Sequence, residues 1–66
     1  MMEIGTRIVE GRKRTWVKDV DDGFLNWLYK RLKSEKHKVI RTKWGISTSA
    51  SVAKIKKLEG YYELGW

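Results

Sequence analysis

The chain has no cysteine, no proline and one histidine, His37. Structural zinc and iron–sulfur sites need several soft ligands, so this composition argues against both. The absence of cysteine gives no sign of an oxidising compartment. No stretch approaches the roughly 20 apolar residues that span a bilayer, and the N-terminus lacks the basic start and apolar run of a signal peptide. We expect a cytoplasmic protein, or one in the host cell if the gene is viral, with no metal and no cofactor.

Residues that could support catalysis are also scarce. His37 lies between two lysines, and we interpret it as an exposed residue at a helix end, because a catalytic base must be positioned in a cleft. The aspartates at positions 19, 21 and 22 lack the glycine and distal glutamate of a calcium loop. No glycine is followed by the Lys-Ser/Thr of a Walker-type phosphate loop. We therefore expect no enzymatic activity and no catalytic residue.

Positive charge is abundant. Fifteen Lys and Arg oppose eight Asp and Glu, which gives a net charge of +7 on 66 residues. The cations fall mainly in the ranges 7–18, 30–43 and 54–57, whereas three of the acids gather at 19–22. A basic folded unit attracts polyanions, because neutralised phosphates release their condensed counterions. The competing interpretation is that these residues only keep a small protein soluble.

The first half of the chain predicts a hairpin followed by a helix. Residues 3–18 show a weak period-2 alternation, with Gly11 able to supply the positive φ of a tight reversal. Asp19 to Asp22 suit a helix N-terminus, where carboxylates accept from unpaired N–H groups. Apolar residues then recur at helical spacing, which predicts a helix over 22–36. They are Phe24, Leu25, Leu28 and Leu32.

The second half predicts a third strand and a second helix. Residues 38–44 are rich in β-branched and aromatic side chains, which favours a strand that Gly45 interrupts. Ser47, Thr48 and Ser49 are candidate N-caps for a helix over about 50–59, and Gly60 is its expected C-cap. Residues 61–66 return as a strand or pack across the core. The expected fold is a single α+β domain over residues 1–66, with a small antiparallel sheet packed on helix 22–36.

Two clusters of residues are candidates for nucleic-acid contact. The hairpin tip carries three consecutive cations next to a tryptophan, and a basic two-stranded ribbon is narrow enough to enter a major groove. These charges could equally protect an edge strand from pairing with other chains. The predicted third strand carries the second cluster. Trp16 or Trp44 could stack on unpaired bases beside cations. The full candidate set is Arg12, Lys13, Arg14, Trp16, Lys38, Arg41, Lys43 and Trp44.

A short segment resembles another DNA-binding arrangement. Trp44-Gly45-Ile46-Ser47, followed by apolar residues at 52, 55 and 58, resembles the turn and second helix of the helix-turn-helix family. The resemblance implies a winged helix-turn-helix as an alternative fold, with a wing beginning at 61–66. Arg41 departs from the small alanine usual in that family, and Val52 falls one place late. On this resemblance the DNA-facing residues would be Ser47, Thr48, Ser49, Ser51 and Lys54, with Lys56 and Lys57 near phosphate.

These observations favour a non-catalytic regulatory or architectural protein that binds DNA, with RNA as a further possibility. The alternative is a small inhibitor or adaptor that docks on an acidic surface of a larger protein, since charge complementarity speeds either kind of encounter. Attachment of helix 22–36 to anionic membranes is a third option. A homo-oligomer is compatible with the sequence.

Overall fold

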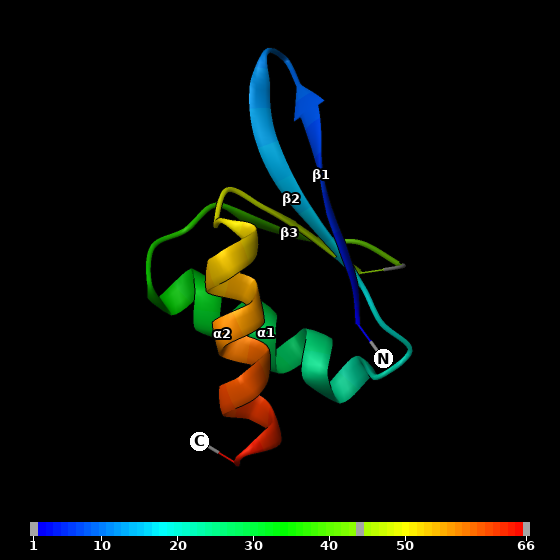
Figure 1. Ribbon diagram of the computed structural model, residues 1–66, viewed down its shortest axis with the longest axis vertical. Helices are drawn as coiled ribbons and strands as arrows, with labels where there is room; N and C mark the ends of the chain where they lie inside the picture. Colours follow the sequence, from blue (N-terminus) through cyan, green and yellow to red (C-terminus); the bar gives the residue numbers. More distant parts are fainter. Residues whose placement is uncertain (1, 44, 66) are drawn as a thin grey trace.

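The structure, a computed structural model, describes residues 2–43 and 45–65 and has an α+β fold, as the sequence predicts (Figure 1). Four strands form one sheet in the order β1-β2-β4-β3, and every neighbouring pair is antiparallel. The sheet therefore has one strand more than we expected. The elements are β1 (Glu3–Val9), β2 (Arg12–Lys18), α1 (Asp22–Ser34), β3 (Val39–Arg41), β4 (Gly45–Thr48) and α2 (Val52–Glu63).

The predicted hairpin is formed by β1 and β2, which pair over seven residues from Glu3↔Lys18 to Val9↔Arg12. Its turn consists of Glu10 and Gly11, with φ values of 53° and 75°. Positive φ at both central residues is the condition for a type I′ turn, whose twist matches that of the flanking strands. The turn thus lies where Gly11 predicted it, although Glu10 adopts the left-handed conformation without the freedom of glycine.

The strand expected over 38–44 is only the short strand β3, and the chain then reverses into another short strand, β4, over residues that we had expected as helix N-caps. The second of them, β4, lies in the middle of the sheet between β2 and β3. Gly45 opens β4 and is buried against the carbonyl oxygen of Val17 so closely that a Cβ there would collide with it. The glycine that we expected to interrupt the strand is therefore what allows β4 to approach β2.

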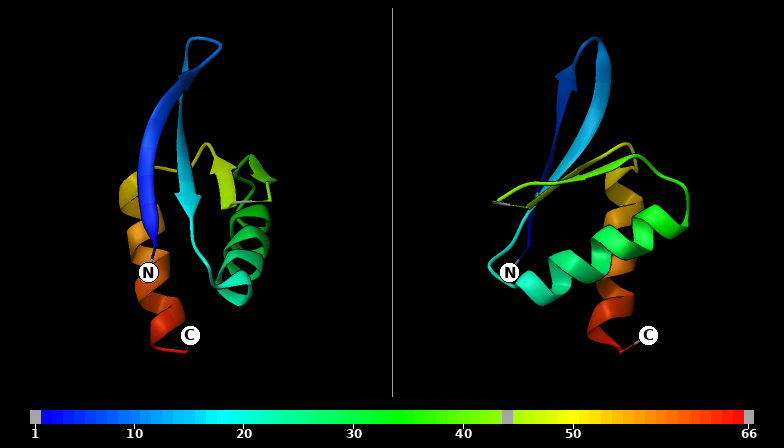
Figure 2. Two further views of the ribbon diagram at one scale, coloured as in Figure 1. Left: turned by 90° about the vertical axis from the view of Figure 1, so that its right-hand side faces the viewer. Right: turned by 180° about the vertical axis from the view of Figure 1, so that it is seen from behind.

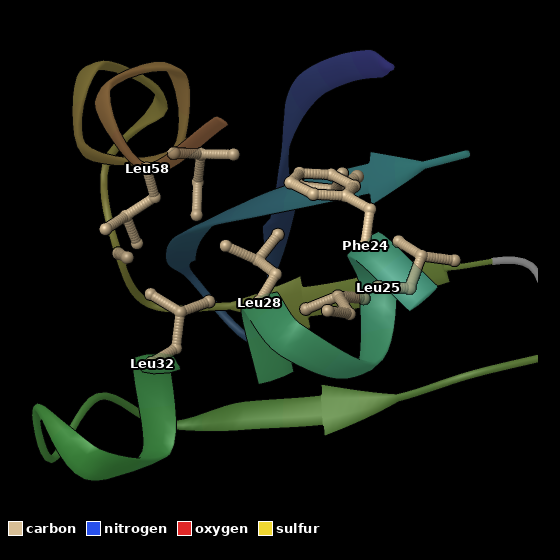
Figure 3. Close-up of a cluster of buried hydrophobic side chains, with 9 residues drawn as sticks. Phe24, Leu25, Leu28, Leu32 and Leu58 are labelled. Atoms are coloured by element: carbon tan, nitrogen blue, oxygen red, sulfur yellow. The ribbon is translucent and has the colours of Figure 1, made fainter. Parts of the chain in front are cut away.

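Both helices pack on the same face of the sheet. Side chains alternate across a strand, and Val17 of β2 and its partner Ile46 of β4 are both buried, so they point toward the helices. The apolar stripe predicted for α1 supplies much of the core, which Leu58 of α2 completes (Figure 3). The buried apolar residues are Val17, Phe24, Leu25, Leu28, Leu32, Ile46, Ala50, Ile55 and Leu58.

Helix α1 begins as predicted and ends two residues early. The Asp21 carboxylate accepts from the Phe24 N–H at 3.0 Å and caps the first turn. At the other end Lys36 has φ 64°, and the His37 N–H donates to the Leu32 carbonyl at 3.1 Å. This is a Schellman arrangement, which normally favours glycine at the left-handed position. Because Lys36 occupies this position in place of glycine, the sequence did not indicate where the helix ends.

Helix α2 is capped by Ser51, whose hydroxyl accepts from the Lys54 N–H at 3.2 Å. It continues through Gly60, the expected C-cap, and incorporates residues that we had assigned to a tail. The reason is packing. The Tyr62 ring lies 5.1 Å from that of Phe24 and 5.3 Å from that of Trp27, and such contacts outweigh the poor helix propensity of one glycine.

The segment that resembles a helix-turn-helix has a different local structure. Gly45–Thr48 form strand β4, so Ser47 and Thr48 lie in the sheet and do not open a helix. Trp44, which also belongs to the resemblance, and Trp66 lie outside the described residues. Within residues 2–43 and 45–65, no helix has the length and apolar character needed to cross a membrane.

Candidate nucleic-acid interface

The sheet has a second face that no helix covers. Because Val17 points to the helices, its neighbours Trp16 and Lys18 point the other way, and the register carries this alternation to the other strands. We call this surface the open face. Its members on the three best-paired strands are Glu3, Gly5, Arg7 and Val9 of β1, Arg12, Arg14, Trp16 and Lys18 of β2, and Gly45 and Ser47 of β4.

The hairpin extends beyond the rest of the sheet. The pairing of β2 with β4 stops at Thr15↔Thr48, whereas its pairing with β1 continues to Val9↔Arg12. The last three pairs and the turn thus form a two-stranded ribbon, which projects at one end of the molecule (Figures 1 and 2). Ile8 lies on the other side of the ribbon, the side that faces the helices lower in the sheet, and it is 70% exposed. Both sides of the ribbon are therefore open to solvent. We call residues 7–14 the ribbon.

The base of the ribbon is held by Trp16. Its indole lies across the neighbouring strand on Gly5, where an added Cβ would be 2.5 Å from Trp16 Cζ2. An aromatic side chain laid over a glycine of an edge strand is a known device for fixing strand register. The Lys18 ammonium lies 5.5 Å from the centre of the same ring. Trp16 is thus half-buried by cross-strand contacts, which limits the base stacking that we had expected of it.

Arg14 is held in a fixed orientation on the open face. Its Nε donates to the Ser47 hydroxyl oxygen at 3.1 Å, and Nη2 lies 3.5 Å from the Ser47 carbonyl oxygen. A guanidinium has five N–H donors, so most of them remain for another acceptor. The Ser47 hydroxyl accepts from Arg14 and keeps its own proton to donate. The pair presents several hydrogen-bond donors together.

A hollow of about 480 Å³ lies on the open face next to Trp16. Two cations and two hydroxyl residues line it, and the rest of its lining comes from β2 and β4. Cations combined with hydroxyl donors suit the oxygens of a phosphate group. The polar residues that line it are Arg7, Lys18, Thr42 and Ser47.

The cations of the ribbon form no ion pair with an acid of the described residues. Arg7 and Arg14 are directly opposed in the register on the same face, and like charges in that relation destabilise a strand pair. Within residues 2–43 and 45–65, the three carboxylate ion pairs between side chains join Arg31 and Lys54 to Glu35, and Arg41 to Asp22. None of them involves the ribbon. Among the described residues Glu3, opposite Lys18, is the one acid on the open face, so that face keeps an excess of positive charge.

The candidate residues from the sequence divide into two groups. Arg12, Arg14 and Trp16 come together on the open face, whereas Lys13 lies on the opposite side of the ribbon. The candidates from the predicted third strand do not lie together on one strand. Lys38 precedes β3 and is exposed, and Lys43 is exposed in the β3–β4 connection. Trp44 lies outside the described residues.

Arg41 is turned away from the open face and holds the β3–β4 connection against α1. Its Nη1 donates to the carbonyl oxygens of Thr42 at 2.7 Å and Gly45 at 3.1 Å. Its Nη2 lies 3.4 Å from an Asp22 carboxylate oxygen. These contacts explain why a basic residue ends β3, and they leave the guanidinium little freedom to contact a ligand.

Acidic residues gather at the end of the molecule opposite the ribbon. The β2–α1 loop and the C-terminal half of α2 meet around a hollow of about 160 Å³ lined by Asp19, Asp21, Glu59 and Glu63. Within the described residues, no three His, Cys, Asp or Glu side chains are arranged to hold a metal ion. Glu3 and Glu10 lie on the sheet and the ribbon, but this gathering of four acids still gives the molecule a charge asymmetry that would orient it in the field of a polyanion.

Glu35 is the acid that neutralises helix cations. It accepts from Lys54 Nζ at 2.6 Å and from Arg31 Nε at 2.9 Å. These two hydrogen bonds, that from Lys54 first, lower the pKa of the Glu35 carboxyl below its ordinary value of 4.5. The ion pairs join the C-terminus of α1 to the start of α2, away from the open face.

Two residues of this surface, Arg7 and Lys18, were missed in the sequence. A hairpin centred on residues 10 and 11 pairs positions that sum to 21, so Arg7 must oppose Arg14. Once the turn is placed at residues 10 and 11, the alternation along the strands puts Arg7 on the same face as Arg12 and Arg14. Lys18 follows from the same alternation along β2.

Comparisons with known proteins add no relative to this description. The chain matches no family model, no curated protein and no solved structure at a significant level.

Proposed function

We propose that the protein binds nucleic acid through the open face of its sheet, with DNA preferred over RNA, and that it acts without catalysis. The single observation that carries the proposal is the excess of positive charge on that face, where four cations stand beside one acid, Glu3. Its four cations lie on one surface around Trp16 and Ser47, and no helix covers them. They are Arg7, Arg12, Arg14 and Lys18.

The arrangement is costly to the fold, which supports a role for it in binding. Arg7 opposed to Arg14 weakens the hairpin, and a projecting two-stranded ribbon has little stability of its own. A protein that needed these cations only for solubility could distribute them over its helices, where lysines already stand. Phosphates laid along the open face would reverse the repulsion, because each would neutralise a cation and release counterions.

The remaining cations support the assignment less strongly. Lys30, Lys33, Lys36, Lys56 and Lys57 are exposed on or near the helices. They raise the net charge and the rate of encounter with a polyanion, but they do not form part of the open face. The proposed binding site is therefore smaller than the total charge of the chain suggests.

The direct test is the affinity of the purified protein for mixed-sequence DNA over a series of salt concentrations. Log K should fall linearly with log salt, with a slope near −0.9 for each duplex phosphate neutralised, hence about −3 to −4 for this face. An uncharged polymer of similar size serves as the negative control. Absence of binding at about 50 mM salt, where such contacts are strong, would contradict the proposal. That outcome would favour the alternative, a protein that docks on the acidic surface of a larger partner.

A further inference from the structure

We infer that the ligand is duplex DNA and that the ribbon enters its major groove with the arginine-bearing face toward the base edges. This inference rests on the proposed function and specifies the kind of nucleic acid, the groove and the orientation. It makes Arg12, near the tip, the residue closest to the bases. Arg7 and Arg14 face each other at the base of the ribbon, where the phosphate strands would pass, and Lys18 lies beyond the ribbon at the other end of β2.

The dimensions of the ribbon support insertion into a groove. Two strands lie about 4.8 Å apart, and four residues from Thr15 to Gly11 span about 14 Å. The major groove is about 12 Å wide and about 8.5 Å deep. The ribbon is thus narrow enough to enter and long enough to reach the floor. The body of the molecule stays outside, because the helices lie toward the other end (Figure 2).

The turn and its flanks suit a deep position. Gly11 has no atom within 4 Å of the place where a Cβ would be, so the tip is slender on that side. On the open face, the pair Val9↔Arg12 comes next to the turn. A guanidinium can donate two hydrogen bonds to guanine O6 and N7, and an aliphatic side chain can contact a thymine methyl group. Both kinds of contact are available only in the major groove.

The hollow beside Trp16 would then receive the phosphate backbone. It lies at the base of the ribbon and is lined by Arg7 and Lys18 with the hydroxyl of Ser47. Because Trp16 is packed on Gly5, it provides a rigid wall for this hollow. Its half-buried indole is poorly placed for serial stacking of unpaired bases, which is the main contact in single-strand binding.

The orientation distinguishes duplex DNA from the other candidates. A-form RNA has a deep and narrow major groove that side chains cannot read, so a ribbon of two strands would not fit. The minor groove of B-DNA is about 6 Å wide, which is also too narrow. The inference therefore predicts weak binding to double-stranded RNA and no competition from minor-groove ligands.

The test uses one mixed-sequence duplex in two forms, unmodified and with every cytosine replaced by glucosylated 5-hydroxymethylcytosine. The sugar fills the major groove and leaves the phosphate charges unchanged. We expect the modified duplex to bind at least about tenfold more weakly, which corresponds to loss of a single good base contact. Netropsin, which occupies the minor groove, should not compete. Single-stranded DNA and duplex RNA of the same sequence should both bind more weakly than the unmodified duplex.

Two variants test the orientation. Arg12→Ala and Lys13→Ala each remove one exposed cation from the tip, and the two residues lie on opposite sides of the ribbon. Arg12→Ala should weaken binding to the unmodified duplex by about tenfold and largely remove the effect of the glucose. Lys13→Ala should cause a severalfold smaller loss of affinity than Arg12→Ala, and the glucose should still weaken the binding of this variant.

The outcomes separate this inference from the proposed function. Equal affinity for the modified and unmodified duplexes, tighter binding of the single strand, or competition by netropsin would overturn the major-groove inference while DNA binding itself remained. A larger loss for Lys13→Ala than for Arg12→Ala would overturn the orientation. Absence of salt-dependent binding to every nucleic acid would instead remove the proposed function.

Discussion

Arg7 and Arg14 face each other across the hairpin on the uncovered side of the sheet. Arg14 is hydrogen-bonded to Ser47, whereas Arg7 is exposed and has no carboxylate partner among residues 2–43 and 45–65. A cross-strand pair of like charges destabilises a hairpin. The relationship is unfavourable for folding and favourable for binding a row of phosphates, so stability and affinity should respond to it in opposite directions.

Arg7→Thr tests this opposition. Threonine suits a strand and removes the repulsion, so the variant should be more stable by about 0.5 kcal/mol. Its affinity for duplex DNA should fall, with the salt dependence reduced by about one phosphate. Thermal or urea unfolding and a binding titration on the same sample measure both effects. A variant that binds as tightly as the wild type would show that Arg7 does not contact DNA.

Glu10→Asn should improve both properties together. Glu10 is a non-glycine residue with φ 53° at the first central position of the turn, and Asn-Gly is the preferred sequence for that turn type. Relief of the backbone strain should stabilise the hairpin by about 1 kcal/mol. Loss of the only acid on the ribbon should also raise the affinity for DNA, because its repulsion of the phosphates disappears. Unchanged affinity would indicate that the tip stays clear of the DNA.

Gly45→Ala tests the close approach of β4 to β2. Because a Cβ at this buried position collides with the Val17 carbonyl, the variant should lose about 3 kcal/mol or more, as overpacked core positions do. Gly60→Ala is the matched control. Nothing lies within 4 Å of a Cβ at Gly60, which is inside α2, so that change should stabilise the protein by about 0.5–1 kcal/mol. Urea denaturation of the two variants should give shifts of opposite sign.

Glu35→Gln tests the ion pairs between the helices through their pH dependence. The pKa of Glu35 is lowered in the folded state, so the unfolded chain binds the proton more readily. The carboxylate therefore stabilises the fold above its ordinary value of 4.5, and this stabilisation is lost as the pH falls through the lowered pKa of the folded state. The unfolding free energy of the variant should depend less on pH in that interval than that of the wild type. Identical pH profiles would contradict this assignment.

The sequence predicted those parts of the fold that depend on local patterns. The 3.6-residue spacing of Phe24, Leu28 and Leu32 identified the buried side of α1, and Gly11 located the turn of the hairpin. Three of the cations and aromatics proposed at the hairpin, Arg12, Arg14 and Trp16, do share one face. These features follow from side-chain periodicity and turn chemistry, which a sequence displays directly.

The errors came where tertiary contacts decide. Gly45 looked like a strand breaker, and its role became apparent only with the Val17 carbonyl beside it. Lys36 occupies a left-handed position that glycine normally marks. Arg41 looked like a free cation, but its guanidinium serves the β3–β4 connection. Val17 is far from Gly45 in the sequence, and the carbonyl oxygens that Arg41 contacts nearby are backbone atoms that every residue carries, so no local pattern revealed these contacts.

The most direct test of the account compares two double variants that remove the same charge from different places. Arg7→Ala with Arg12→Ala takes two exposed cations from the ribbon, and Lys30→Ala with Lys56→Ala takes two from the exposed surfaces of the helices. The measurement is the salt dependence of the affinity for one DNA duplex. The slope of log K against log salt should correspond to about two fewer neutralised phosphates in the ribbon variant, and it should equal the wild-type slope in the helix variant. Equal losses in the two variants would mean that binding follows total charge, and the open face would not be the site.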